Sequence, residues 1–337
     1  MNNSVIGLDI AKNIFHLYTY VEDKPIKKML KRAELLAFFG NYPVSLIGIE
    51  ACGSAHHWAR ELTKLGHEVV LLNTRFVKSF VMGNKNDFND AAAIFDAVTR
   101  PNKRVVAIKT IEQQDMQLIH NIRQGLVGHR TALVNQIRGM LSERGIIIPQ
   151  GVNKVRERLP LILEDAENNL SPIAREVFAE QYENLRALDD AIKEQDRRIN
   201  RFCNNNALSK RFLQVPGVGP MTATIIASNI GDGKGYQSSR DYAASLGVVP
   251  RQHSSGGKLV YLGISKRGNR YIRTLLIHGA RSVLKVSSHK NDKLSLWLQS
   301  LVERRGFNKA AVALANKNAR ILWAMATQDK EYNALLV

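Results

Sequence analysis

Four acidic side chains stand at positions where a carboxylate needs a partner. Asp9 closes the apolar run VIGLD, Glu50 closes LIGIE, and Asp87 and Asp90 stand in NDFNDAAAIFDAV at the start of a helical pattern. An acid at the end of an apolar strand is unfavourable unless it is paired or binds a cation, and residues at i and i+3 share one helical face. Four carboxylates meeting at one point would bind Mg²⁺ or Mn²⁺, which polarises a phosphoryl oxygen.

The same acids also have a simpler interpretation. Asp87 and Asp90 can be ordinary acids of a first helical turn, which the helix dipole favours, and Asp9 and Glu50 can be two unrelated residues at strand ends. The spacing leaves both interpretations open.

The segment that begins at Pro250, PRQHSSGGK, offers a second kind of chemistry. Ser254 and Ser255 precede two glycines, and a serine attacks a phosphodiester only when a base, a metal or oriented cations assist it. Taken alone, such serines are usually turn residues. His253 could be a general base, but in a basic loop a phosphate contact is the more usual role.

Basic residues follow the serines. We predict a basic, glycine-rich loop that leads into a helix, and we expect basic side chains of both to neutralise phosphates. These residues are Lys258, Lys266, Arg267, Arg270 and Arg273.

The segment VPGVGPMTATIIA, from Val215 to Ala227, has the pattern of a helix-hairpin-helix motif. Gly217 and Gly219 would let backbone amides approach a phosphate, and the following helix would add its dipole. The alternative is a tight helix–helix turn in which glycine is required for packing.

The charge indicates the kind of partner. The chain has 48 Lys and Arg against 30 Asp and Glu. Residues 251 to 320 alone contain fifteen of the basic residues, with only Asp292 and Glu303 opposing them. So dense a positive field favours a polyanion, because each neutralised phosphate releases counterions. We therefore expect a nucleic-acid partner.

Three regions of the chain differ in their pattern of apolar and polar residues. Residues 1–109 combine short apolar runs, which predict strands, with the helical pattern of residues 56–66, and so predict an α/β domain. Residues 110–203 predict two long helices, 111–144 and 171–203, joined by a turn around Pro149 and Pro160, and such paired helices usually dimerise or space domains. Residues 204–337 predict a smaller, mainly α domain.

Composition also bears on the compartment. Cys52 and Cys203 belong to no CxxC pair and cannot form a disulfide framework. The start MNNSVIGLDIAK lacks the features of a signal peptide, and no apolar run reaches membrane-spanning length. We expect a cytoplasmic protein with no membrane partner.

The order GLDIAK, GIEACG, KNDFNDA resembles the DEDD catalytic domain of transposases of the insertion-sequence 110 family, whose relatives include the Piv DNA invertases. The form GNKNDxxDA resembles that family's 1111 subgroup. The resemblance implies an RNase H-like (RuvC-like) N-terminal domain, a long helical coiled-coil linker and a C-terminal transposase domain. It assigns metal binding to Asp9, Glu50, Asp87 and Asp90, and the family's essential serine, a few residues after Pro-Arg and before a glycine, falls on Ser255.

The resemblance also implies a reaction and partners. Ser255 would attack a DNA phosphodiester and form a phosphoserine link, assisted by Mg²⁺ at the four acids. Family members form dimers that join into tetramers, so that the acids of one protomer could act with Ser255 of another. In studied relatives a structured non-coding RNA pairs with both target and donor DNA, and we expect such a guide RNA here. We expect the protein to be associated with the bacterial nucleoid.

Two other functions compete with this one. A Holliday-junction nuclease would use the four acids to activate water and would form no covalent adduct, so Ser255 would be dispensable. A non-catalytic architectural or RNA-binding protein would need only the basic region, and the four acids would then be structural.

Overall fold

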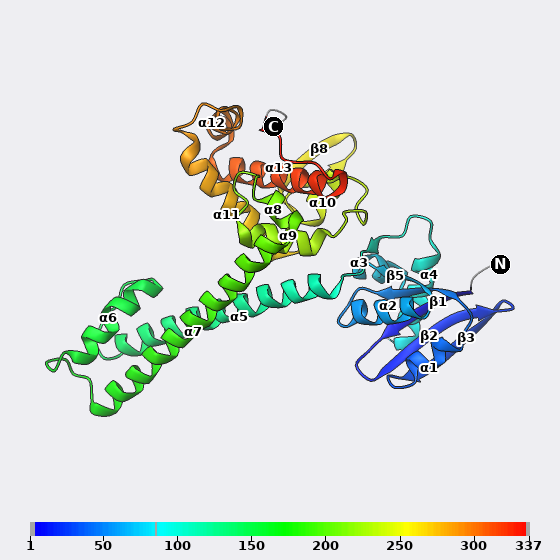
Figure 1. Cartoon of the computed structure of the whole chain (residues 1–337), viewed down its shortest axis with the longest axis horizontal. Helices are drawn as coiled ribbons and strands as arrows, with labels where there is room; N and C mark the ends of the chain where they lie inside the picture. The colour runs from blue at the N-terminus through cyan, green and yellow to red at the C-terminus, as the bar shows by residue number, and fades with distance from the viewer. Residues whose placement is uncertain (1–3, 85, 335–337) are drawn as a thin grey trace. The chain divides into compact units, whose positions relative to one another are not determined.

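The computed structural model describes residues 4–84 and 86–334, and Lys85 of the GNKND motif lies outside them. The chain forms two compact units, Met1–Thr110 and Ile111–Val337 (Figure 1). Each unit has its own hydrophobic core, and each is described by itself.

A six-stranded sheet forms the centre of the first unit, in the order β3-β2-β1-β4-β5-β6. β1 pairs antiparallel with β2 and parallel with β4, and β2 and β5 continue the sheet on the two sides. The strands are β1 Ser4–Ile10, β2 Ile14–Val21, β3 Lys24–Lys31, β4 Ser45–Glu50, β5 Glu68–Leu72 and β6 Val105–Val106. The α/β prediction for this part of the chain is confirmed, and the mixed sheet is consistent with an RNase H-like domain.

Helices cover both faces of this sheet. Ile6, Leu8 and Ile49 face one core, together with residues of α1 and α2. Val5 and Leu46 face the other core, together with α4 and the segment before it. The helices are α1 Leu35–Gly40, α2 Ala55–Lys64, α3 Thr74–Val77, the 3₁₀ turn Lys78–Phe80 and α4 Asp87–Thr99.

Two glycines bring α4 unusually close to the sheet. Gly7 of β1 and Gly48 of β4 are paired in register. A Cβ on Gly7 would collide with the backbone of α4 near Phe95, and one on Gly48 would lie 2.8 Å from Cβ of Val98. Only glycine leaves room for the helix at these two positions.

The sequence did not reveal β3, and the physical reason is its composition. Its residues KPIKKMLK are exposed apart from Leu30, so no apolar run marks it. It is an edge strand, and its lysines suit an edge because they discourage pairing with another chain.

Long helices begin the second unit. α5 (Ile111–Ser142) packs along α7 (Pro172–Asn205). These are the two long helices that the sequence predicted. The segment between them is not a simple turn, because it contains α6 (Val152–Glu164) with Pro160 inside it. Val155 and Leu159 of α6 are fully buried against the long helices, and this burial outweighs the helix-breaking tendency of the proline.

The rest of the second unit is a mainly helical body with one two-stranded hairpin. α11 and α10 both pack on α13, and α9 packs on α5 and α7. Its elements are α8 Ala207–Phe212, α9 Pro220–Ile230, α10 Ser239–Ser245, β7 Pro250–Ser255, β8 Lys258–Ile264, α11 Arg270–Ser287, α12 Lys293–Arg305 and α13 Phe307–Gln328. Every helix in the described part of the chain is too short or too polar to span a lipid bilayer.

Candidate active site

Three of the four predicted acids meet at one edge of the first unit. One carboxylate oxygen each of Asp9, Asp87 and Asp90 lies within 4.8 Å of the others. Asp9 lies on β1, whereas the other two begin α4, nearly eighty residues further along the chain. Glu50, at the end of β4, is near enough for its charge to act on Asp9.

The register of the strands explains this convergence. Gly7 and Asp9 are two residues apart on β1, as Gly48 and Glu50 are on β4, and alternate residues of a strand share one face. Each glycine therefore faces α4 and places the acid after it on the same side of the sheet. The repeated pattern Gly-x-acid, in GLD and GIE, is the signal in the sequence for this convergence.

The start of α4 fixes the other two acids. Asn86 is the N-cap, and its side chain accepts a hydrogen bond from the amide of Phe88 at 2.9 Å. Asp87 is consequently the first helical residue and Asp90 the fourth, so both project from one side of the first turn.

Electrostatics show how unfavourable this cluster is without a cation. Burial and, in decreasing order, the negative charges of Asp90, Asp87 and Glu50 together raise the pKa of Asp9 from 3.8 to about 6. Simple helix-start acids, the alternative interpretation, account for Asp87 and Asp90. They do not account for a partly buried carboxylate brought to the same point from a strand.

His16 is a neighbour of the cluster that sequence reasoning missed. It pairs with Asp9 in the β1–β2 register, is 8% exposed, and its ring contacts Phe88 edge-on at 4.7 Å between centroids. Its Nδ1 has no hydrogen-bond partner among the described residues and lies 3.8 Å from Oδ2 of Asp87. The only signal in the sequence was its place between the inward-facing Phe15 and Leu17, which turns it to the α4 side.

The donor set fits a hard divalent cation. Carboxylate oxygens are the ligands that Mg²⁺ and Mn²⁺ prefer, and Mg²⁺ is usually held by few carboxylates together with water and substrate phosphate. The side chain of Asp87 is 60% exposed, so the site is open to solvent on one side.

Ser255 lies in the second unit, at the tip of a hairpin. It ends β7 and pairs with Lys258 across a two-residue turn. Gly256 and Gly257 form that turn with φ of +56° and +78°, the left-handed conformations that tight hairpin turns require and that glycine adopts without strain. The predicted loop is therefore a β-hairpin, and residues 250–263 are exposed throughout.

The structure distinguishes the two serines. The hydroxyl of Ser254 accepts a hydrogen bond from Nε2 of Gln252 at 2.8 Å. Within the described part of the chain, the hydroxyl of Ser255 has no such partner. Because successive strand residues face opposite sides, Ser255 shares a hairpin face with His253.

Four of the five predicted phosphate contacts are exposed, namely Lys258, Lys266, Arg267 and Arg270. Arg273 differs: it is 8% exposed, and its Nη1 donates to the carbonyls of Leu246 and Arg267 at 2.9 and 2.8 Å. The prediction of a surface role for Arg273 therefore needs correction. Its guanidinium is used inside the unit, where it ties the segment after β8 to the end of α10.

The two glycines of the predicted DNA-binding hairpin also differ. Gly217 has φ +84°, and a Cβ there would lie 2.7 Å from the carbonyl oxygen of Gly279 in α11. This contact matches the packing interpretation of Gly217. Gly219 caps α9, is exposed, and has open space where a Cβ would be, so its backbone is accessible to a ligand.

Comparisons with known proteins agree with this organisation. A family model described as "Transposase" of the DEDD type matches residues 6–145, and one described as "Transposase IS116/IS110/IS902 family" matches residues 209–294. The first match contains the four acids, and the second contains Ser255.

Full-length relatives extend the match over nearly the whole chain. A Pseudomonas aeruginosa protein described as a probable family 20 transposase is 44% identical over 98% of this chain and 99% of its own. The transposase for insertion sequence element IS1111A of Coxiella burnetii is 44% identical over 97% of this chain and 91% of its own.

A pilin gene-inverting protein of Moraxella bovis matches part of the chain: it is 24% identical over 55% of this chain and 61% of its own.

Proposed function

Since the chain belongs to the IS116/IS110/IS902 family of transposases, enzymes that cleave and rejoin DNA, we propose that it does so through a covalent bond between Ser255 and DNA. The observation that carries the proposal is the meeting of carboxylates from β1 and α4, which supplies a divalent-cation site. The isolated, exposed hydroxyl of Ser255 supplies the nucleophile.

Asp9, Asp87 and Asp90 would hold Mg²⁺ or Mn²⁺, with Glu50 as a further ligand. When bound, the ion neutralises charge that develops on a phosphoryl oxygen. The raised pKa of Asp9, about 6, is consistent with a site built for a cation, because the positive charge would favour the ionised carboxylate.

The covalent step conserves one phosphodiester. Oγ of Ser255 forms a bond to phosphorus as the bond to one sugar oxygen breaks, the serine proton passes to solvent, and the leaving sugar oxygen takes up a proton. A sugar hydroxyl of the recipient strand then attacks the phosphoserine and releases Ser255. No bond energy is lost in this exchange, so the reaction needs neither ATP nor a polymerase. Lys258, Lys266, Arg267 and Arg270 would bind the phosphates on either side.

The proposed partners are supported by the family and by the basic surface of the second unit. DNA ends of the mobile element and its target would be bound in the cytoplasm, on the nucleoid. A structured guide RNA would supply sequence specificity through base pairing, while the protein would bind mainly backbone and shape. The long helices would join protomers into dimers and tetramers, in which the acids of one chain would act with Ser255 of another.

A covalent-adduct assay tests this proposal. Purified protein, Mg²⁺, labelled element-end and target DNA, and RNA transcribed from the flanking sequence are incubated, and a denaturation-resistant protein–DNA adduct is measured. We expect an adduct with wild type, a loss of at least about a hundredfold in Ser255→Ala and Asp9→Asn, and retention in Ser254→Ala.

Each opposing result has a definite meaning. Cleavage without an adduct, unchanged in Ser255→Ala, would replace the recombinase with a nuclease that activates water. Nucleic-acid binding and cellular phenotype that survive replacement of all four acids would indicate an architectural protein.

A further inference from the structure

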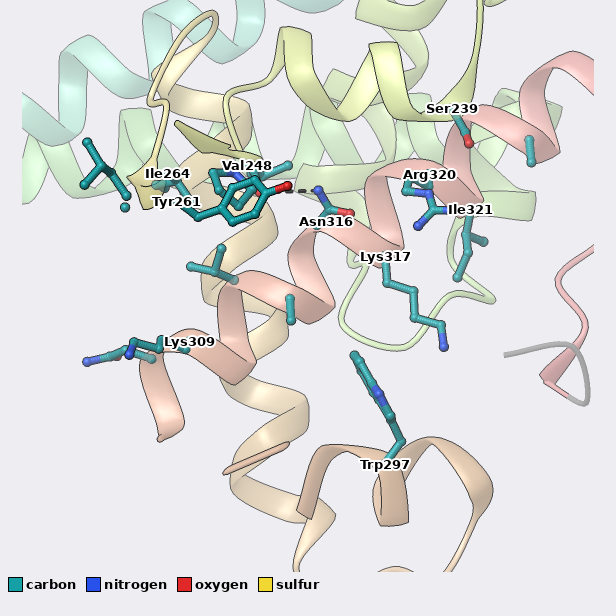
Figure 2. Close-up of a pocket in the computed structure, with 17 residues that line it drawn as sticks. Ser239, Val248, Tyr261, Ile264, Trp297, Lys309, Asn316, Lys317, Arg320 and Ile321 are labelled. Carbon is teal, nitrogen blue, oxygen red and sulfur yellow. Dashed lines mark hydrogen bonds between the residues drawn. The ribbon is translucent and has the colours of Figure 1, made fainter. Parts of the chain in front are cut away.

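A groove in the second unit has a lining suited to a single nucleic-acid strand. It has a volume of about 1290 Å³ and lies between β8 and α13, with Trp297 of α12 at one end (Figure 2). Tyr261 and Ile264 of β8 flank its other end, and α13 runs between the two aromatic side chains.

α13 presents two different faces. One is buried in the core of the unit. The other lines the groove and combines small or apolar side chains with three cations, Lys309, Lys317 and Arg320. No acidic residue lines the groove, and these three side chains form no ion pair with any described residue.

The cations of the groove lie close to one another as well as lacking acidic partners. The ammonium of Lys317 lies 4.7 Å from the ring centroid of Trp297. Partial burial lowers the pKa of Lys317, and the neighbouring charges of Lys293 and Arg320 lower it further. An anion in the groove would relieve this repulsion.

We propose that the groove binds unpaired nucleotides of the DNA strand next to the phosphodiester that Ser255 attacks. A duplex offers phosphates but hides its bases, whereas a single strand offers both phosphates for the cations and base faces for aromatic side chains. Tyr261 is 65% exposed, which suits it for stacking on a base.

Position favours the cleaved strand as the occupant. Ser255 and Tyr261 belong to the same hairpin, Ser255 opposite Lys258 and Tyr261 three residues further along β8. At 3.4 Å per residue this separation is about 10 Å along the ribbon. Tyr261 pairs with Gln252 and so lies on the opposite hairpin face from Ser255, and a strand bound at the serine would pass over the edge of the ribbon to reach the groove. The choice of DNA therefore rests on the function proposed for Ser255.

The test measures binding in full-length Ser255→Ala protein, which cannot form the adduct, so a failure of the covalent mechanism does not affect it. Fluorescence anisotropy gives the affinity for a labelled twelve-nucleotide single-stranded DNA and for the same sequence as a duplex. We expect Tyr261→Ala to weaken single-strand binding about fivefold or more and to change duplex binding less than twofold. In Lys317→Gln/Arg320→Gln, the slope of log affinity against log salt should fall by about 0.7 for each lost phosphate contact.

Matched controls are available in the same unit. Leu296→Ala removes an exposed apolar side chain next to Trp297 on α12, and Lys285→Gln removes an exposed charge from α11; neither residue lines the groove. Both should bind like the parent protein. DNA carrying 5-iododeoxyuridine should crosslink to Tyr261 or Trp297 on irradiation.

Unchanged single-strand affinity in Tyr261→Ala and in Lys317→Gln/Arg320→Gln would overturn the proposal, as would crosslinks found only elsewhere. So would single-stranded RNA of the same sequence that binds at least tenfold more tightly and loses this advantage in Tyr261→Ala, because the occupant would then be RNA.

Discussion

At the scale of single residues, the acids show what sequence reasoning can reach. Asp9 and Glu50 were recognisable because each interrupts an apolar run at its end, where a carboxylate has a cost that must be offset. His16 was not recognisable, because its importance arises from strand pairing with Asp9. Arg273 was misjudged because a basic residue in a basic segment gives no sign that backbone carbonyls inside the unit bind it.

Divalent cations should stabilise the protein through this cluster. At ten times its dissociation constant, an ion that binds only the folded state adds about 1.4 kcal/mol to the free energy of unfolding. We therefore expect Mg²⁺ or Mn²⁺ to raise the melting temperature of wild type, as measured by differential scanning calorimetry, and to have no such effect on Asp87→Asn.

Asp96→Asn is the matched control, since Asp96 is an exposed acid further along the same helix. It should respond to the ion like wild type. Equal stabilisation of wild type and Asp87→Asn would show that the ion binds elsewhere.

Among the helices and strands, the sequence predicted those whose apolar residues are buried in a regular pattern. The central strands were visible because they are buried, and the two long helices because their apolar residues recur at helical spacing. β3 was invisible, because its exposed, lysine-rich residues form no apolar run. β8 was missed although KLVYLGI is an apolar run, because so short a run does not by itself distinguish a strand from a helix. α6 was hidden by Pro160, whose local effect is overcome by contacts to α5 and α7 that no local pattern contains.

A buried histidine joins three helices of the second unit and predicts a pH dependence. Nε2 of His120 on α5 lies 3.0 Å from the hydroxyl of Thr224 on α9, which itself donates to the carbonyl of Pro220. Nδ1 lies 3.0 Å from the hydroxyl of Tyr271 on α11. A neutral ring that donates through Nε2 and accepts at Nδ1 satisfies every proton in this chain of hydrogen bonds.

Burial, assisted by the charge of Arg123, lowers the pKa of His120 from 6.5 to about 4. As the pH falls below 6.5, the unfolded chain therefore takes up this proton before the folded one, and stability is lost progressively down to about pH 4. We expect His120 to lower the free energy of unfolding by about 2 kcal/mol as the pH falls from 6.5 to 5.

Urea denaturation at a series of pH values measures this effect. His120→Gln, which cannot titrate, should show a flatter profile than wild type over that interval. The pKa of His56 in the first unit is lowered to about 4 in the same way, so the comparison with His120→Gln is needed to separate the two. Parallel profiles for wild type and variant would contradict the assignment.

At the scale of the whole molecule, the two kinds of chemistry belong to different units. The acids lie in the first unit and Ser255 in the second. The proposed composite site requires association of protomers, and α5 carries exposed apolar side chains that suit it. Leu118 and Ile122, one turn apart, are 57% and 49% exposed.

Charges placed on this stripe should separate protomers. We expect Leu118→Glu/Ile122→Glu to shift sedimentation velocity profiles from dimer toward monomer and to reduce the Ser255–DNA adduct in parallel. Asn121→Asp/Gln124→Glu adds two negative charges at exposed polar positions of the same helix and should leave the dimer intact. A dimer unchanged in the first variant would remove these side chains from the interface.

The hairpin that bears Ser255 has a consequence for the host cell. A two-stranded ribbon with little buried surface is only marginally stable by itself, and residues 250–263 are exposed. If the nucleophile is fixed in its working orientation only when nucleic acid lies along the ribbon, an encounter with the wrong sequence leaves it poorly aligned. Weak support for the reactive element would then protect the chromosome from accidental breaks, and a mobile element survives only in a host whose genome it does not destroy.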